Sequence, residues 1–95
     1  MEAERRLRPE DVVELNPNYH FRWEEPQQAH VLLYPEGIVK LNRTAAAILE
    51  ACTGATSIEA GTAELSRLYR HSDLGPEIIK FLEIAHAKGW IRIKS

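Results

Sequence analysis

The pattern of apolar and polar positions in the first half of the chain predicts a small antiparallel sheet. Residues 19–24 alternate aromatic and polar side chains, which is typical of a half-buried strand. Residues 29–34 and 38–41 are two apolar runs separated by Pro35-Glu36-Gly37, a composition that favours a tight hairpin. We therefore expect a three-stranded antiparallel meander.

The spacing of apolar residues then changes to a helical period. Residues 43–53 place their apolar side chains on one face, Asn42 is a suitable cap and Gly54 ends the helix. A second helix is predicted from Thr56, which has the spacing of a capping box with Glu59. Gly61 lies inside this helix and costs about 1 kcal/mol relative to alanine. Either the second helix frays early, or another part of the chain packs closely there.

The last third of the chain predicts one more helix and a closing strand. The third helix runs from about Pro76 to Lys88, before Gly89, and residues 90–93 alternate again. The predicted fold class is therefore α+β and winged-helix-like: a three-stranded antiparallel sheet, then three helices and a short final strand. Residues 1–17 are polar and interrupted by prolines, so we expect a flexible N-terminal arm with a short ordered piece around residues 12–13, and a domain over residues 18–95.

The third helix carries more apolar surface than one core stripe needs. Its core face is flanked by Ile79 and His86 on one shoulder and by Ile84 on the other. The apolar residues together span an arc of roughly 200° around the helix. One explanation is that a shoulder lines a groove. The other is that the N-terminal arm, the final strand or a second copy of the chain covers the shoulders.

Composition restricts the partners and the compartment. The 95 residues include 12 basic and 14 acidic side chains, a net charge of -2, which argues against a protein that mainly neutralises phosphates. The single Cys52 lies on the apolar face of the first helix and is expected to be a buried structural thiol. The charged start of the chain and the lack of a membrane-length apolar segment favour a cytoplasmic protein with no membrane partner.

The residue types used in catalysis or metal binding form no recognisable constellation. Zinc sites need closely spaced ligands, and the four histidines lack that spacing. The carboxylates are scattered over predicted solvent faces, and no base accompanies the cysteine. We expect no enzymatic activity, no cofactor and no metal. The histidines in question are His20, His30, His71 and His86.

A winged-helix DNA-binding regulator is the alternative from another functional class. The second and third helices could form a helix-turn-helix, whose recognition helix normally presents Arg, Lys, Asn or Gln at its first turn. The third helix instead begins with Pro76, Glu77 and two isoleucines. The architecture fits DNA binding and the side chains do not, so nucleic acid is not an expected partner.

One segment carries a resemblance to a known family. Residues 30–42 read HVLLYPEGIVKLN and residues 44–49 read TAAAIL, and together they closely resemble the PqqD family of pyrroloquinoline quinone (PQQ) biosynthesis. The spacing to Gly54, to residues 57–58 and to the KGWI of residues 88–91 also fits, so the resemblance spans roughly residues 7–91. Gly61 is a departure, because such proteins usually carry an aliphatic residue there.

The resemblance implies a peptide chaperone without catalytic activity. PqqD-like proteins bind the precursor peptide PqqA and present it to the radical SAM enzyme PqqE, which cross-links a glutamate to a tyrosine. The same fold recognises leader segments in other ribosomally made, modified peptides, and the leader adds as a strand to the sheet edge and lies against the third helix. The peptide-binding residues expected here are Gly37, Ile38, Val39, Lys40, Leu41, Ile79, Leu82, Glu83 and His86.

Three points stay open at this level. The resemblance barely separates PqqA from another modified peptide as the ligand. An apolar edge strand could also pair with itself, so we expect a monomer or a weak homodimer. The face of the edge strand that meets the peptide is undetermined. Strand addition predicts that Val39→Pro, which removes a possible ladder donor, weakens peptide binding sharply.

Overall fold

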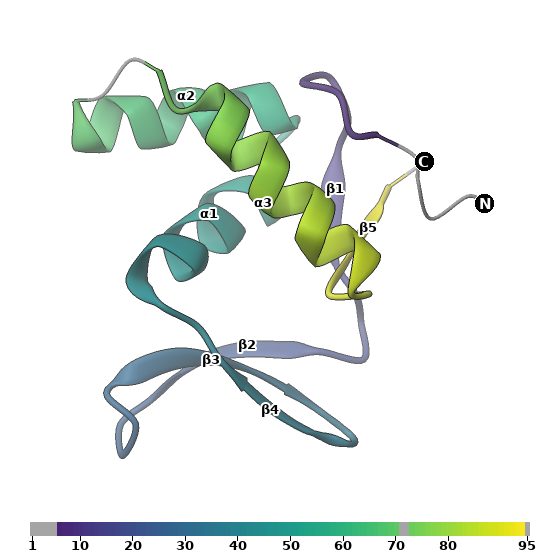
Figure 1. Cartoon of the computed structure of the whole chain (residues 1–95), viewed down its shortest axis with the longest axis vertical. Helices are drawn as coiled ribbons and strands as arrows, with labels where there is room; N and C mark the ends of the chain where they lie inside the picture. Colours follow the sequence, from purple (N-terminus) through teal and green to yellow (C-terminus); the bar gives the residue numbers. More distant parts are fainter. Residues whose placement is uncertain (1–5, 71–72, 95) are drawn as a thin grey trace.

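The computed structural model describes residues 6–70 and 73–94, and it contains two small sheets and three helices (Figure 1). Residues 1–5 of the expected arm, and His71, lie outside the described residues. The α+β architecture predicted from the sequence is confirmed. The elements in chain order are β1 (Val13–Leu15), β2 (His20–Glu24), β3 (Ala29–Tyr34), β4 (Gly37–Lys40), α1 (Arg43–Thr53), α2 (Ile58–Tyr69), α3 (Gly75–Ala87) and β5 (Ile91–Ile93).

The larger sheet is the expected meander, with strand order β2-β3-β4. In its register Phe21 lies opposite Leu32, and Leu32 lies opposite Val39. Leu32 is fully buried, and Phe21 and Val39 pack against the core, so this row of side chains forms the inner face of the sheet. The strand β4 begins at Gly37, one residue earlier than predicted. Among the described residues β3 alone pairs with it, so its other edge is free.

Local sequence signals fix α1 as predicted. The Asn42 side-chain oxygen accepts a hydrogen bond from the Ala45 amide at 2.7 Å, which satisfies one of the unpaired donors of the first turn. The helix ends before Gly54. Its buried residues are Ala45, Ala46, Ile48, Leu49 and Cys52.

The start of α2 differs from the expectation. The cap is Ser57, whose hydroxyl accepts from the Ala60 amide at 3.0 Å, and the predicted Thr56–Glu59 capping box is wrong. The amides between Ser57 and Ala60 donate to main-chain carbonyls of the N-terminal segment. Ile58 N–H donates to Asp11 O and Glu59 N–H donates to Pro9 O, both at 2.8 Å. The start of this helix is therefore held by one local side chain, Ser57, and by two distant carbonyls, for which the local sequence carries no signal.

Gly61 marks a close approach of α1 and α2. A Cβ atom at this position would lie 2.8 Å from Cys52 Sγ, 2.9 Å from Cys52 Cα and 3.0 Å from Ala51 O. Backbone atoms of α1 cannot move aside as a flexible side chain can. Of the two explanations open from the sequence, close packing therefore accounts for this glycine. An aliphatic residue here would force the two helices apart.

The N-terminal segment requires a correction to the predicted boundary at residue 17. Residues 13–15 form β1, which pairs antiparallel with β5 as a second, two-stranded sheet. Leu7 and Val13 are buried in the same core as the helices, being 5% and 1% exposed. Residues 6–17 are thus part of the packed fold, because they supply core side chains, a strand and the cap of α2.

The lengths of the helices bear on whether any of them could span a membrane. None of the helices within residues 6–70 and 73–94 has the length and apolar character needed to span a bilayer. The longest of them, α3, has 13 residues.

Candidate functional site

The free edge of β4 is the first half of the candidate site. Gly37, Ile38 and Lys40 are exposed, Val39 is half-buried and Leu41 is buried at 5% exposure. Val39 and Leu41 face the core, whereas Ile38, which is 49% exposed, and Lys40 lie on the opposite face of the strand. This predicted segment therefore offers an accessible backbone with one apolar and one cationic side chain on its outer face.

The direction of the backbone groups of β4 follows from one hydrogen bond. Leu41 N–H donates to His30 O at 2.9 Å, so this residue pair is a hydrogen-bonded pair of the ladder. Such pairs alternate along antiparallel strands, so Gly37 and Val39 also direct their amide and carbonyl groups at β3. Ile38 and Lys40 direct theirs away from the sheet. The free hydrogen-bonding groups of this edge are those of Ile38 and Lys40.

The predicted residues of α3 lie on its side facing the N-terminal segment. Glu83 accepts a hydrogen bond from the Leu7 amide at 3.2 Å, and Ile79 and His86 are half-buried on the same shoulder. Leu82 is completely buried, so it packs into the core rather than facing a ligand. We call Ile79, Glu83 and His86 the closed shoulder, because the chain itself packs beside it.

The opposite shoulder of α3 opens into a cleft. The helix α3 forms one wall, the first half of α1 the other, and the end of α2 closes it, around a volume of about 580 Å³. We call Glu77, Phe81 and Ile84 the open shoulder; the first two line the cleft, and Ile84 is 46% exposed. At 3.6 residues per turn the two shoulders flank the core face on opposite sides. The cleft is lined by Asn42, Arg43, Thr44, Ala45, Ala47, Ile48, Leu65, Tyr69, Leu74, Glu77, Ile78 and Phe81.

The cleft and the β4 edge are adjacent along the chain. β4 ends at Lys40, and Asn42 and Arg43, two and three residues later, already line the cleft. The wall formed by α3 is mainly apolar, with Glu77 as its acidic group, and Arg43 supplies a basic group on the α1 side. This pairing of a free strand edge with an apolar cleft suits an extended chain that carries apolar side chains. Sequence periodicity identified both shoulders of α3 but not the one that lines a cleft.

Reactive and metal-binding groups do not converge near the cleft. Among the residues that the structure describes, no group of three His, Cys, Asp or Glu side chains is placed to hold a metal ion. Cys52 is fully buried, and its removal from water raises the pKa of the thiol to about 11. A thiol in this environment stays protonated at neutral pH, so it is a poor nucleophile.

Comparison with known proteins places this geometry in context. A family model described as coenzyme PQQ synthesis protein D (PqqD) matches residues 29–91. A Methylococcus capsulatus protein named PqqA binding protein is 45% identical over 86 residues, covering 90% of this chain and 92% of that protein. An Azotobacter vinelandii protein of the same name is 44% identical over 84 residues, covering 87% and 91%.

A solved structure has the same fold. It is the solution NMR structure of the PqqD truncation of Methylobacterium extorquens PqqCD, described as a functional, stand-alone recognition element for ribosomally synthesised and post-translationally modified peptides. Its TM-score with this chain is 0.79 at 24% identity, covering 97% of this chain and 99% of that one. The likeness therefore includes the N-terminal segment as well as the sheet and helices.

Proposed function

Because the chain belongs to the PqqD family, we propose that it is a non-catalytic peptide chaperone of PQQ biosynthesis. Its ligand is the precursor peptide PqqA, which it presents to the radical SAM enzyme PqqE in the cytoplasm. The relatives named PqqA binding protein support the choice of peptide. The observation that carries the proposal is the free edge of β4, after which the chain continues at Asn42 and Arg43 into the wall of an apolar cleft beside α3.

In the proposed complex the peptide extends the larger sheet as a fourth strand. The outward amide and carbonyl groups of Ile38 and Lys40 pair with the peptide backbone, which supplies affinity without reading side chains. Alternate peptide side chains then lie on the inner face, beside Val39. Apolar ones among them enter the cleft against Phe81, and Arg43 or Glu77 pairs with charged neighbours.

A titration followed by amide NMR tests this proposal. The isotope-labelled full chain is titrated with a synthetic PqqA peptide, and we expect shifts concentrated in residues 37–41 and in Glu77 and Phe81. Binding of a peptide with the same composition in scrambled order is the control. The proposal fails if PqqA causes no shifts at high excess, or if the shifts avoid both β4 and the cleft.

Strand addition is tested separately by a matched pair of variants at Lys40. Lys40→Pro and Lys40→Ala both remove the charge, but only proline removes the outward amide donor. Proline is tolerated where an edge-strand amide faces solvent, so both variants should fold. We expect Lys40→Pro to bind PqqA about ten-fold more weakly than Lys40→Ala. Equal affinities would rule out pairing at this position.

The register of β4 shows that Val39→Pro is not a suitable test of strand addition. Val39 directs its amide at β3, so Val39→Pro removes a hydrogen bond within the sheet. That variant is expected to weaken the β3–β4 hairpin, and any loss of binding would not report on the peptide. Lys40 is therefore the position at which a proline substitution is informative.

A further inference from the structure

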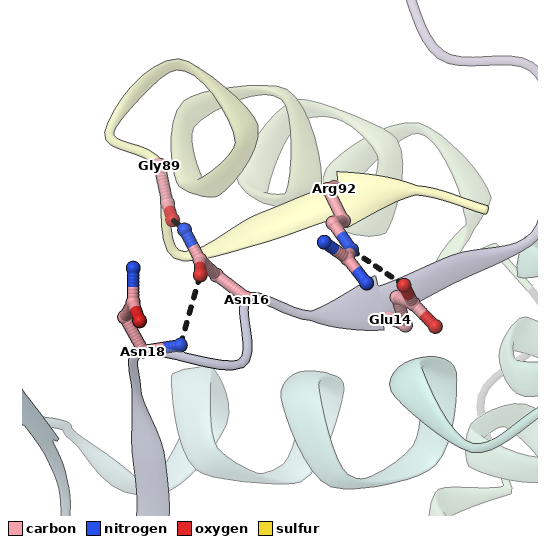
Figure 2. Close-up of polar contacts among 5 residues, drawn as sticks. All are labelled: Glu14, Asn16, Asn18, Gly89 and Arg92. Atoms are coloured by element: carbon pink, nitrogen blue, oxygen red, sulfur yellow. Dashed lines mark hydrogen bonds and ion pairs between the residues drawn. The ribbon is translucent and has the colours of Figure 1, made fainter.

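Asn16 lies at the corner where the two sheets of the molecule meet, between β1 and β2 (Figure 2). All four of its polar groups are hydrogen-bonded. Its amide donates to Trp90 O at 2.9 Å, and its side-chain Nδ2 donates to Gly89 O at 2.8 Å. Its carbonyl accepts from Tyr19 N–H at 2.9 Å, and its side-chain Oδ1 accepts from Asn18 N–H at 3.0 Å. Two bonds thus reach the chain after α3, and two reach the chain before β2.

We call the four hydrogen bonds of Asn16 the bridge. The residues at its two ends are themselves joined to α3 and to β2. On one side, Gly89 N–H donates to His86 O and Trp90 N–H donates to Ala85 O, so both residues are joined to the last turn of α3. Gly89 has a φ of +83°, a left-handed conformation that glycine adopts without strain. On the other side, Asn18 and Tyr19 directly precede β2, whose ladder with β3 leads on to β4. Asn16 therefore links the end of α3 to the sheet that carries the free edge.

This link matters because the backbone of α3 runs close to other elements rather than to that sheet, which α3 meets only through core side chains. The main neighbours of α3 are α1, α2 and β5, and none of the strands β2, β3 and β4 is among them. In Figure 1 the larger sheet lies below α1, and α3 runs above that sheet from the side of α2 towards β5. The relative orientation of α3 and β4 is therefore set through α1 and through the corner at Asn16.

We propose that Asn16 is a positioning residue, which holds α3 at a fixed orientation to the β2-β3-β4 sheet and so preforms the site at the cleft and the β4 edge. It contacts neither. Its role in binding rests on the proposed function, whereas its effect on the orientation of α3 does not. A preformed site avoids part of the ordering cost of binding, so loosening the bridge lowers affinity without removing any contact with the ligand.

The first test measures orientation in the absence of peptide. Residual dipolar couplings of amides in α3 and in the β2-β3-β4 sheet are compared for the full chain, Asn16→Ala and Glu14→Gln. The control weakens the Glu14–Arg92 ion pair, which joins β1 to β5 but not the corner (Figure 2). We expect the unaltered chain and Glu14→Gln to fit one alignment tensor, and Asn16→Ala to need a separate tensor for α3. A single tensor for Asn16→Ala would overturn the proposal.

The second test measures PqqA binding by titration calorimetry. We expect Asn16→Ala to bind about five-fold more weakly, the equivalent of about one neutral hydrogen bond, and Glu14→Gln to bind normally. Asn16→Asp keeps the acceptor for Asn18 but loses the donor to Gly89, so we expect it to weaken binding as well. Equal affinity for all four proteins would overturn the role in binding. If the unaltered chain does not bind PqqA, the proposed function fails while the dipolar couplings still decide the role of Asn16.

Discussion

The two shoulders of α3 have similar apolar character but very different surroundings. On the closed shoulder, Glu83 accepts from the Leu7 amide, and Leu7 itself is buried in the core. On the open shoulder, Phe81 faces a cleft of about 580 Å³. Leu7 thus lies beside the closed shoulder, whereas the open shoulder lines a cleft whose other walls are α1 and the end of α2. An unusually wide apolar arc on a helix can thus combine a self-covered side with an accessible one.

This difference shows that coverage is decided by chain segments far away in sequence. Leu7 and Glu83 are 76 positions apart. Helical periodicity places Phe81 at the edge of the core face and Ile79 on a shoulder, and neither position indicates which side of α3 lines a cleft. The comparison predicts that substitutions on the closed shoulder change mainly stability, and that those on the open shoulder change mainly binding.

The largest effect is expected from Leu7→Ala. Leu7 is 5% exposed, and truncating a buried leucine costs about 3 kcal/mol of unfolding free energy. Urea denaturation measures this loss, and PqqA affinity of the folded protein should stay close to that of the unaltered chain. Leu74→Ala is the matched control, since Leu74 lines the cleft and is only half-buried, so it should cost less stability. A negligible cost for Leu7→Ala would mean that the closed shoulder is not covered in solution.

The next effect is expected in binding. Phe81→Ala removes the aromatic ring from the cleft and should weaken PqqA binding at least ten-fold, about 1.4 kcal/mol, as for an interface anchor. Ile79→Ala, on the closed shoulder, should leave the affinity within about two-fold. Calorimetric titration measures both. The comparison between the shoulders fails if Ile79→Ala weakens binding as much as Phe81→Ala.

The smallest effect is expected from Glu83→Ala. The substitution removes the acceptor of the Leu7 amide, a partly buried hydrogen bond worth about 1 kcal/mol of unfolding free energy. Lys80→Ala alters an exposed residue of the same helix and should change stability by less than about 0.5 kcal/mol. Urea denaturation compares the two variants, and equal stabilities would show that the Leu7–Glu83 contact contributes nothing.

Elements built from local signals were predictable. The hairpin at Pro35, the Asn42 cap and the span of α1 depend on neighbouring residues, and the structure has them where the sequence predicts them. At the start of α2, Ser57 is a local signal, but the carbonyls of Pro9 and Asp11 were not predictable as partners, because they reach the helix from a distant part of the chain. The same holds for the pairing of β1 with β5. Residues 6–17 look like an arm by composition, and only non-local contacts make them part of the fold.

The candidate site was predictable in part for the same reason. The strand at Gly37 to Leu41 follows from an apolar run after a turn, and its expected role in binding follows from the family resemblance. Which of their amides is free depends on the register of β4 against β3, which a sequence pattern does not specify. The cleft needs three helices to be placed relative to one another, so Phe81 and Arg43 had no distinguishing signal. Gly61 was a partial signal outside the site, since its cost in a helix left early fraying and close packing both open, and the structure shows close packing.

The close approach of α1 and α2 gives the protein an internal chemical reporter. Cys52 is fully buried under Gly61, and the raised pKa of its thiol keeps it protonated at neutral pH. Because the unfolded chain ionises at a lower pH than the folded one, stability should fall as the pH rises from the ordinary value of 9.0 towards about 11. At neutral pH, alkylation of Cys52 requires the two helices to separate. The rate of modification by a thiol reagent therefore records how often the domain opens, without any added probe.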